Sequence, residues 1–126
     1  MARVLIMEDE PGIKMVLEMV LREEGHQVTA VEDGQRGLQA LESGTPPDVV
    51  FVDLHMPIVD GQTVLERMQN SPLLRGIPAV LMTGDGASSP LLPPRSHYAA
   101  ILSKPFDIWD VVQQARRLSA PKRATG

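Results

Sequence analysis

The chain has 126 residues, of which 43% are hydrophobic and 22% are charged, and these values fit one globular domain with its own core. Its formal net charge of −4 gives no electrostatic reason to expect direct nucleic-acid binding, and the absence of cysteine excludes disulfide frameworks and thiolate sites. No apolar stretch approaches the ~20 residues of a membrane span, and the N-terminus meets acidic residues too early for a signal peptide, so we expect a cytoplasmic chain without a membrane partner.

The first half of the chain predicts strands alternating with helices. Val4–Met7 is an unbroken apolar run, which is typical of a strand buried on both faces. Apolar residues then recur at helical spacing until Gly25, which closes the predicted helix. The expected inward residues of this helix are Ile13, Val16, Leu17, Val20 and Leu21. A second strand, a short helix and a third strand are predicted over residues 27–31, 34–41 and 48–53.

The second half continues the same alternation. A helix is predicted over 61–69, a fourth strand over 77–82 and a fifth over 99–102. Asp107 can cap a last helix. The residues that repeat on one face of this helix are Ile108, Val111, Val112, Ala115 and Leu118. We expect one domain over residues 2–119, and we interpret residues 120–126 as a tail or the stub of a linker.

The segment between Thr83 and Tyr98 interrupts the alternation where a fourth helix should lie. Pro93 and Pro94 stand inside it, and a proline in a helix interior costs about 3 kcal/mol. We therefore predict a long loop, with at most a short helical turn that starts near Pro94 or Ser88.

Five strands alternating with helices predict a parallel sheet covered by helices on both faces. In such folds, ligands bind at the carboxyl ends of the strands. The polar residues Glu8, Asp9, Asp53, Thr83 and Lys104 all end or follow predicted strands. Together they predict a phosphoryl-transfer site that depends on Mg2+.

A magnesium ion takes about six oxygen ligands and keeps several of its waters. The carboxylates of Glu8, Asp9 and Asp53 can supply part of this shell, and the backbone carbonyl of His55 is the most plausible further ligand.

An aspartate nucleophile can form an aspartyl phosphate. Phosphoryl transfer needs positioned cations and donors, and here Mg2+ and Lys104 would be the cations and Thr83 the neutral donor. No residue is an obvious general base for fast hydrolysis. A phosphoryl group on Asp53 should therefore persist, which suits a signal and not a turnover enzyme.

Four short motifs resemble the receiver domain of two-component response regulators, and the likeness to the stand-alone chemotaxis regulators of this family covers about residues 2–119. The motifs are Glu8–Pro11, Val52–Gly61, Met82–Gly84 and Ser103–Phe106. The resemblance implies a doubly wound α/β fold of the flavodoxin-like (βα)5 type, with a five-stranded parallel sheet in the order 2-1-3-4-5.

The resemblance also implies a role for each site residue. Asp53 would accept a phosphoryl group from a histidine kinase or a phosphotransfer protein, while Glu8 and Asp9 would hold Mg2+. Thr83 would move toward the phosphoryl group and Lys104 would pair with it. The phosphorylated chain would then act on an output protein or effector domain that the sequence does not identify.

The chain departs from the family pattern at two places. Ile101 stands three residues before Lys104, where the family usually has a Tyr or Phe that turns inward on activation. The proline-rich segment replaces the fourth helix, which usually belongs to the output face. We therefore expect a non-standard output surface, or coupling through another face. The family pattern also implies a cis peptide at Lys104–Pro105.

Two other classes of protein use a similar fold. A haloacid-dehalogenase-like phosphatase needs a second acid two residues after the nucleophile, where this chain has His55, and a longer chain for its cap. A flavodoxin-like FMN carrier needs a phosphate-binding loop after the first strand. Glu8, Asp9 and Glu10 would repel phosphate there in the absence of a metal.

Overall fold

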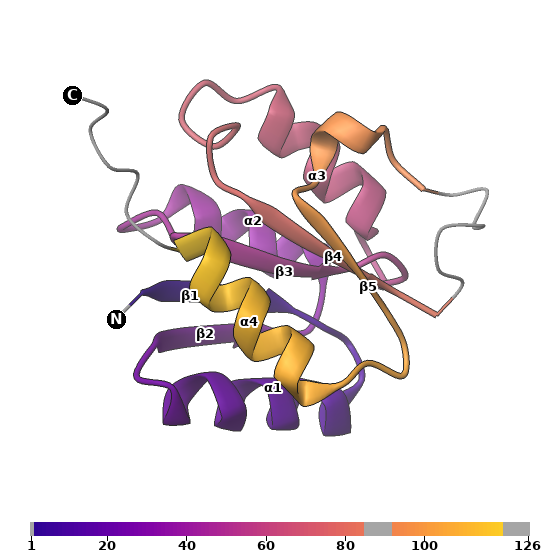
Figure 1. Ribbon diagram of the computed structural model, residues 1–126. Helices are drawn as coiled ribbons and strands as arrows, with labels where there is room; N and C mark the ends of the chain where they lie inside the picture. The colour runs from indigo at the N-terminus through magenta and orange to yellow at the C-terminus, as the bar shows by residue number, and fades with distance from the viewer. Residues whose placement is uncertain (1, 85–91, 120–126) are drawn as a thin grey trace.

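A computed structural model describes residues 2–84 and 92–119. Five parallel strands form one sheet in the order β2-β1-β3-β4-β5 (Figure 1), so the predicted strand order and the flavodoxin-like architecture are confirmed. The strands are β1 (Arg3–Met7), β2 (Gln27–Val31), β3 (Val49–Asp53), β4 (Ala79–Thr83) and β5 (Ala100–Ser103). The predicted elements are therefore all present, with strand boundaries shifted by one or two residues.

Helices cover both faces of the sheet (Figure 1). Helices α1 (Pro11–Glu23) and α4 (Ile108–Ser119) pack on one face, and α2 (Gly34–Glu42) and α3 (Gly61–Gln69) pack on the other. Within the described residues, no helix combines the length and the apolarity that crossing a membrane requires.

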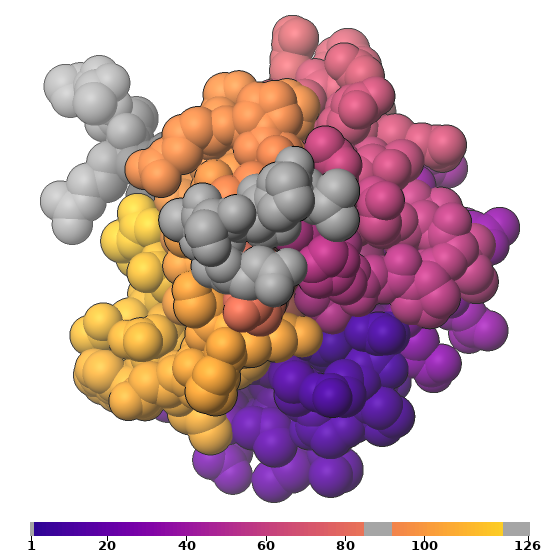
Figure 2. All heavy atoms as spheres, turned by 90° about the vertical axis from the view of Figure 1, so that its right-hand side faces the viewer, coloured from indigo at the N-terminus to yellow at the C-terminus, as the bar shows by residue number. Residues whose placement is uncertain are grey.

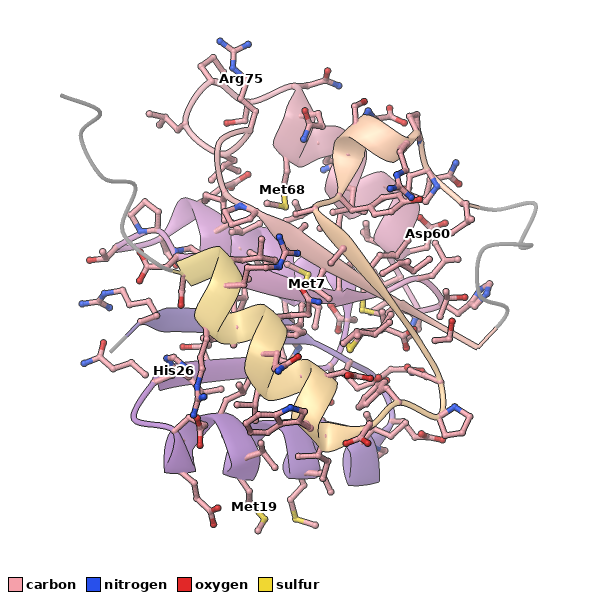
Figure 3. The ribbon with its side chains drawn as sticks, viewed as in Figure 1. Met7, Met19, His26, Asp60, Met68 and Arg75 are labelled. Atoms are coloured by element: carbon pink, nitrogen blue, oxygen red, sulfur yellow. The ribbon has the colours of Figure 1, made fainter. Side chains whose placement is uncertain are left out.

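The two cores follow from the alternation of side chains along each strand. In β1, Leu5 and Met7 join the cluster under α2 and α3, whereas Val4 and Ile6 join the cluster under α1 and α4. Each fully buried aliphatic side chain contributes roughly 1.5–3 kcal/mol. Figure 3 shows the contrast between Met7, which lies inside the molecule, and Met19, which projects from α1 into solvent.

Three helices begin at an aspartate cap. Asp33 accepts a hydrogen bond from the backbone N–H of Arg36, and Asp60 accepts one of 2.8 Å from Thr63. Asp107 accepts one of 2.8 Å from Trp109, which confirms the predicted cap of the last helix. Such caps typically contribute about 1 kcal/mol each.

Two residues predicted to face inward are instead exposed. Val16 is 38% exposed and Ile108 is 44% exposed. Both border an apolar hollow of about 380 Å3 between α1 and the start of α4. They stay accessible because none of the described elements covers this hollow.

The connection between β4 and β5 contains no α-helix among the residues that the structure describes. A 3-10 helix, η2 (Arg95–His97), directly follows Pro94, so the turn predicted near Pro94 is confirmed, while the alternative start at Ser88 lies outside the described residues. Pro93 is buried, and Leu92 and Tyr98 pack against the core under α2 and α3. The segment from Leu92 to Tyr98 therefore covers part of the core, although it contains no α-helix, as predicted.

Gly34, at the start of α2, touches the loop that follows β3. A Cβ atom at Gly34 would lie 2.1 Å from the backbone oxygen of Val59. Such a distance is far below van der Waals contact, and the obstacle is backbone that cannot simply rotate away.

Replacing Gly34 by alanine should therefore lower the free energy of unfolding by about 2 kcal/mol or more. Urea denaturation followed by circular dichroism measures the change. Gly12→Ala is the matched control, because nothing lies within 4 Å of a Cβ there. Alanine at Gly12 should leave stability unchanged or raise it by up to about 1 kcal/mol. Equal effects of the two substitutions would contradict the close contact.

His26 lies near the end of the sheet opposite Asp60 (Figure 3). Its Nδ1 accepts a hydrogen bond of 3.2 Å from the backbone N–H of Ala2, so this nitrogen carries no proton. Burial lowers the pKa of His26 in the folded chain.

The unfolded chain therefore binds a proton on His26 more readily than the folded chain does. The free energy of unfolding should fall as the pH drops below about 6.5, the unperturbed pKa of histidine. Denaturation curves across this range measure the loss. His26→Asn keeps an acceptor for Ala2 without the titration, and its stability should fall less over the same range. Parallel pH profiles of the two chains would refute the assignment.

Candidate functional site

The predicted site residues meet at the carboxyl edge of the sheet. Glu8 and Asp9 follow β1, Asp53 and Thr83 are the last residues of β3 and β4, and Lys104 follows β5. Because the strands are parallel and adjacent, these ends share one edge. Figure 2 faces this edge, where the indigo, magenta and orange segments that follow β1, β3 and β5 come together.

Three carboxylates form a compact cluster there. Glu8, Asp9 and Asp53 each place a carboxylate oxygen within 4.8 Å of the others. Glu8 is fully buried and Asp53 is 4% exposed, whereas Asp9 is exposed to solvent. Buried carboxylates are costly unless a cation or hydrogen-bond donors compensate them.

Lys104 supplies the compensating positive charge. Its Nζ lies 2.7 Å from Oε1 of Glu8 and 3.2 Å from Oδ2 of Asp53. Oε2 of Glu8 also accepts a hydrogen bond of 3.1 Å from the backbone N–H of Glu10.

The pKa values follow from this arrangement. Burial and the neighbouring Glu8 raise the pKa of Asp53 to about 7, although Lys104 opposes the shift. Burial by itself would lower the pKa of Lys104, but the contacts with Glu8 and Asp53 outweigh it and raise the pKa. The single positive charge of Lys104 therefore does not balance the negative charges of Glu8, Asp9 and Asp53.

This donor set fits a magnesium ion. Hard carboxylate oxygens are the ligands that Mg2+ takes in proteins, and the excess negative charge favours a divalent cation. Glu8, Asp9 and Asp53 could supply three of its ligands. The backbone N–H of His55 lies 3.3 Å from Oδ1 of Asp53, and the role predicted for the His55 carbonyl stays a prediction.

Thr83 and Ile101 occupy different places relative to this cluster. Thr83 is fully buried, and its backbone oxygen accepts a hydrogen bond of 2.8 Å from Lys104. Ile101 lies on the edge strand β5, pairs with Leu81 and is partly buried against the core under α2 and α3. The geometry thus joins Thr83 to the site and places Ile101 against the core. The peptide between Lys104 and Pro105 is cis, as predicted.

The loop after Asp53 contains a feature that the sequence did not indicate. Ile58 has a φ of +71°, and the N–H of Val59 donates to the oxygen of Pro57 at 2.8 Å. This is the rare and strained form of γ-turn. A branched side chain at positive φ costs on the order of 1–3 kcal/mol. Nothing in the local sequence points to it, because isoleucine disfavours this conformation.

Close backbone contacts hold this loop in place. The N–H of Gly61 donates to the oxygen of Leu54 at 3.0 Å, and a Cβ at Gly61 would lie 2.3 Å from the oxygen of Asp53. The loop is therefore fixed on one side by Gly61 and on the other by the contact between Val59 and Gly34.

A family model for the response regulator receiver domain matches residues 4–116, so the chain belongs to this family. The helix-covered parallel sheet with an acidic, lysine-paired carboxyl edge is thus the receiver domain of a two-component system. Receiver domains are signalling modules that histidine kinases phosphorylate and that act on output domains.

Several relatives carry a similar domain within longer proteins. The chain is 33% identical over 119 residues to the DNA-binding dual master transcriptional regulator RpaA of Synechocystis sp., covering 94% of this chain and 49% of RpaA. It is 34% identical over 116 residues to the response regulator PleD of Caulobacter vibrioides, covering 91% of this chain and 25% of PleD. The chain therefore spans half or less of the length of these two relatives.

Solved structures share the fold. A response regulator from Chloroflexus aurantiacus superimposes with a TM-score of 0.86 and 27% identity, covering 95% of this chain and 98% of that one. The receiver domain of the sensor histidine kinase PA1611 from Pseudomonas aeruginosa has a TM-score of 0.86, 23% identity and coverages of 95% and 98%. That structure holds a magnesium ion coordinated in its active-site cleft.

Replacing Lys104 by methionine should destabilise the metal-free chain. Glu8 and Asp53 would remain buried without their cation, and we expect the free energy of unfolding in EDTA to fall by about 2 kcal/mol. Excess Mg2+ should recover part of this loss because it would compensate the same carboxylates. Chemical denaturation with and without Mg2+ measures both effects.

Lys14→Met is the matched control for this prediction. Lys14 pairs with Glu32 at 3.8 Å on the surface, where such pairs contribute less than about 1 kcal/mol. This variant should show a small loss that Mg2+ does not change. A loss at Lys104 that is equally large with and without Mg2+ would rule out the shared role.

Proposed function

We propose that this chain is a phosphorylation-controlled signalling module in which Asp53 is the phosphoacceptor. The observation that carries the proposal is the buried Asp53 carboxylate, which lies 3.2 Å from Lys104 within a cluster of acids suited to a divalent cation. The phosphodonor would be a histidine kinase or a phosphotransfer protein, and the reaction would require Mg2+.

Each site residue has a proposed part in the transfer. An oxygen of Asp53 attacks the phosphorus atom, and the bond from phosphorus to the donor's histidine nitrogen breaks as the new P–O bond forms. Glu8, Asp9, Asp53 and the backbone carbonyl of His55 would hold Mg2+, which supplies charge stabilisation for the phosphoryl oxygens. Lys104 would turn from the carboxylates to the phosphoryl group and stabilise it.

We propose that the chain is a switch and not a turnover enzyme. Among the described residues, the side chains placed beside Asp53 are those of Glu8, Asp9 and Lys104, which suit metal binding and charge stabilisation. The alternative of a haloacid-dehalogenase-like phosphatase is not favoured, because His55 replaces the second acid that such an enzyme needs.

The response would pass from Asp53 to Thr83, which ends the neighbouring strand. We propose that Thr83 moves toward the phosphoryl group. Ile101 has no hydroxyl, so it cannot exchange hydrogen bonds as a tyrosine would, and the segment containing Leu92 and Tyr98 packs where a helix usually contributes to the output face. The output surface is therefore proposed to differ from the usual one.

The boundaries, the location and the partners of the domain are proposed as well. We propose that the receiver domain spans residues 2–119, that residues 120–126 form a tail or linker stub, and that the chain works in the cytoplasm. Its partners would be a phosphodonor protein and an output protein or effector domain. The net charge of −4 argues against direct contact with nucleic acid.

Incubation with acetyl phosphate and Mg2+ should add one phosphoryl group to the chain, and Asp53→Asn should abolish the addition. Intact-protein mass spectrometry measures the added mass. Chelation of Mg2+ with EDTA should also prevent labelling, because the carboxylate cluster would then repel the phosphoryl donor.

The matched control is Asp110→Asn, which removes an exposed carboxylate on α4 and should leave labelling unchanged. Labelling that persists in the Asp53 variant would refute the phosphoacceptor. Continuous release of phosphate with many turnovers per chain would instead favour the phosphatase alternative.

A further inference from the structure

Exposed apolar side chains gather on one face of the molecule. Among the described residues, seven large apolar side chains are exposed, and five of them lie on α1 or α4. They are Met15, Val16, Met19, Ile108 and Trp109, and we call this set the α1/α4 patch. Its side chains leave on the order of 500 Å2 of apolar surface in solvent, an extent that often marks an interaction site.

The patch is continuous because α1 and α4 lie side by side and run in the same direction (Figure 1). Val16 and Ile108 border the apolar hollow of about 380 Å3 between the starts of the two helices. At the other end, Nε of Arg116 donates a hydrogen bond of 3.1 Å to Glu24. Met19 projects from α1 into solvent (Figure 3), about one helical turn beyond Val16. The same surface therefore carries an apolar depression and a projecting apolar side chain.

A surface with both of these features can be complementary to itself. In a two-fold pair of identical chains, each contact occurs twice with the roles of the two copies exchanged. If the two copies of α1 run antiparallel, Met19 of each copy meets the hollow of the other. Methionine suits such a contact, because its flexible thioether side chain adapts to irregular apolar gaps.

Charges around the patch favour the same antiparallel pairing. The end with the hollow is acidic, since Glu10 lines the hollow and Asp110 stands in the first turn of α4. The opposite end carries Arg117, in the last turn of α4. Its guanidinium bonds Gln114 and pairs with no acid among the described residues. An antiparallel pair brings the acidic end of each copy toward the arginine of the other, which is electrostatically favourable.

We infer that the α1/α4 patch is the interface of a symmetric homodimer, in which Met19 of each copy fills the hollow beside Val16 and Ile108 of the other. The patch contains none of the clustered carboxylates, so the inference is independent of the proposed function of Asp53. An interface of this extent lies at the small end of the range for specific complexes. The dimer should therefore be weak, and its population should depend on protein concentration.

Sedimentation equilibrium of the unaltered chain between about 10 and 500 µM covers the affinities expected of a weak dimer. Met19→Glu would place a carboxylate in the apolar hollow, next to Glu10 of the other copy. It should raise the dissociation constant by about tenfold or more. Its urea midpoint in dilute solution should match that of the unaltered chain, because Met19 is 56% exposed in the single chain.

Leu73→Glu is the matched control for this variant. Leu73 is 85% exposed and follows α3, which covers the opposite face of the sheet. The substitution replaces an apolar residue by the same acid, away from the α1/α4 patch. It should leave the dissociation constant within about twofold of the original value.

The absence of cysteine allows the pairing to be mapped with introduced thiols. A mixture of Met19→Cys and Ile108→Cys chains should form a mixed disulfide under mild oxidation, because the two positions would meet across the interface. A mixture of Met19→Cys and Leu73→Cys chains should form far less. Non-reducing electrophoresis and mass spectrometry measure both products.

A chain that stays monomeric throughout this concentration range would overturn the inference and would leave the patch to a different protein. A dimer that Met19→Glu does not weaken would also overturn it, because the hollow would then lie outside the interface. Equal cross-linking through Leu73 would do the same, since it would indicate random collision and not a defined pair.

Discussion

The buried contact of Lys104 with Glu8 and Asp53 is the interaction on which the site depends. Burying carboxylates costs several kcal/mol each unless their charge is compensated. The chain places one ammonium within 2.7 Å of Glu8 and 3.2 Å of Asp53, and leaves a further carboxylate, Asp9, exposed beside them. Burial, and after it the neighbouring Glu8, raises the pKa of Asp53 to about 7. The excess of negative charge among these three carboxylates also favours a divalent cation at the same position. Stability and chemistry are therefore linked through one set of atoms.

The same edge explains why the loop after Asp53 is so tightly constrained. Gly34 and Gly61 allow backbone to approach backbone on either side of the loop, where a Cβ atom would overlap an oxygen. A loop held in this way can keep a strained residue such as Ile58, because the strain is small compared with the contacts that oppose its release. The rigidity also fixes the direction in which the backbone leaves Asp53. A site that relies on positioned charges needs this kind of support.

The strands and the position of the candidate site could be predicted from the sequence. Buried strands such as 49–53 give unbroken apolar runs, and polar residues directly after them mark the edge where parallel strands end together. The exposure of Val16 and Ile108 could not be read, because helical spacing shows which residues share a face but not where the sheet beneath them stops. The turn at Ile58 was equally hidden, since long-range contacts with Gly34 impose it against local preference.

The packing between β4 and β5 separates the proposed acceptor site from the proposed route of the response. Thr83 is tied to Lys104 through a backbone hydrogen bond and so belongs to the site. Ile101 lies on the paired strand, two residues before the partner of Thr83, and it is partly buried against the same core as Leu92 and Tyr98. A side chain packed against that core can shift inward only if its neighbours repack, because protein interiors are close-packed. If Thr83 moves as proposed, its movement would spread through the packing of Ile101 and this covering segment, and not through an aromatic ring at position 101.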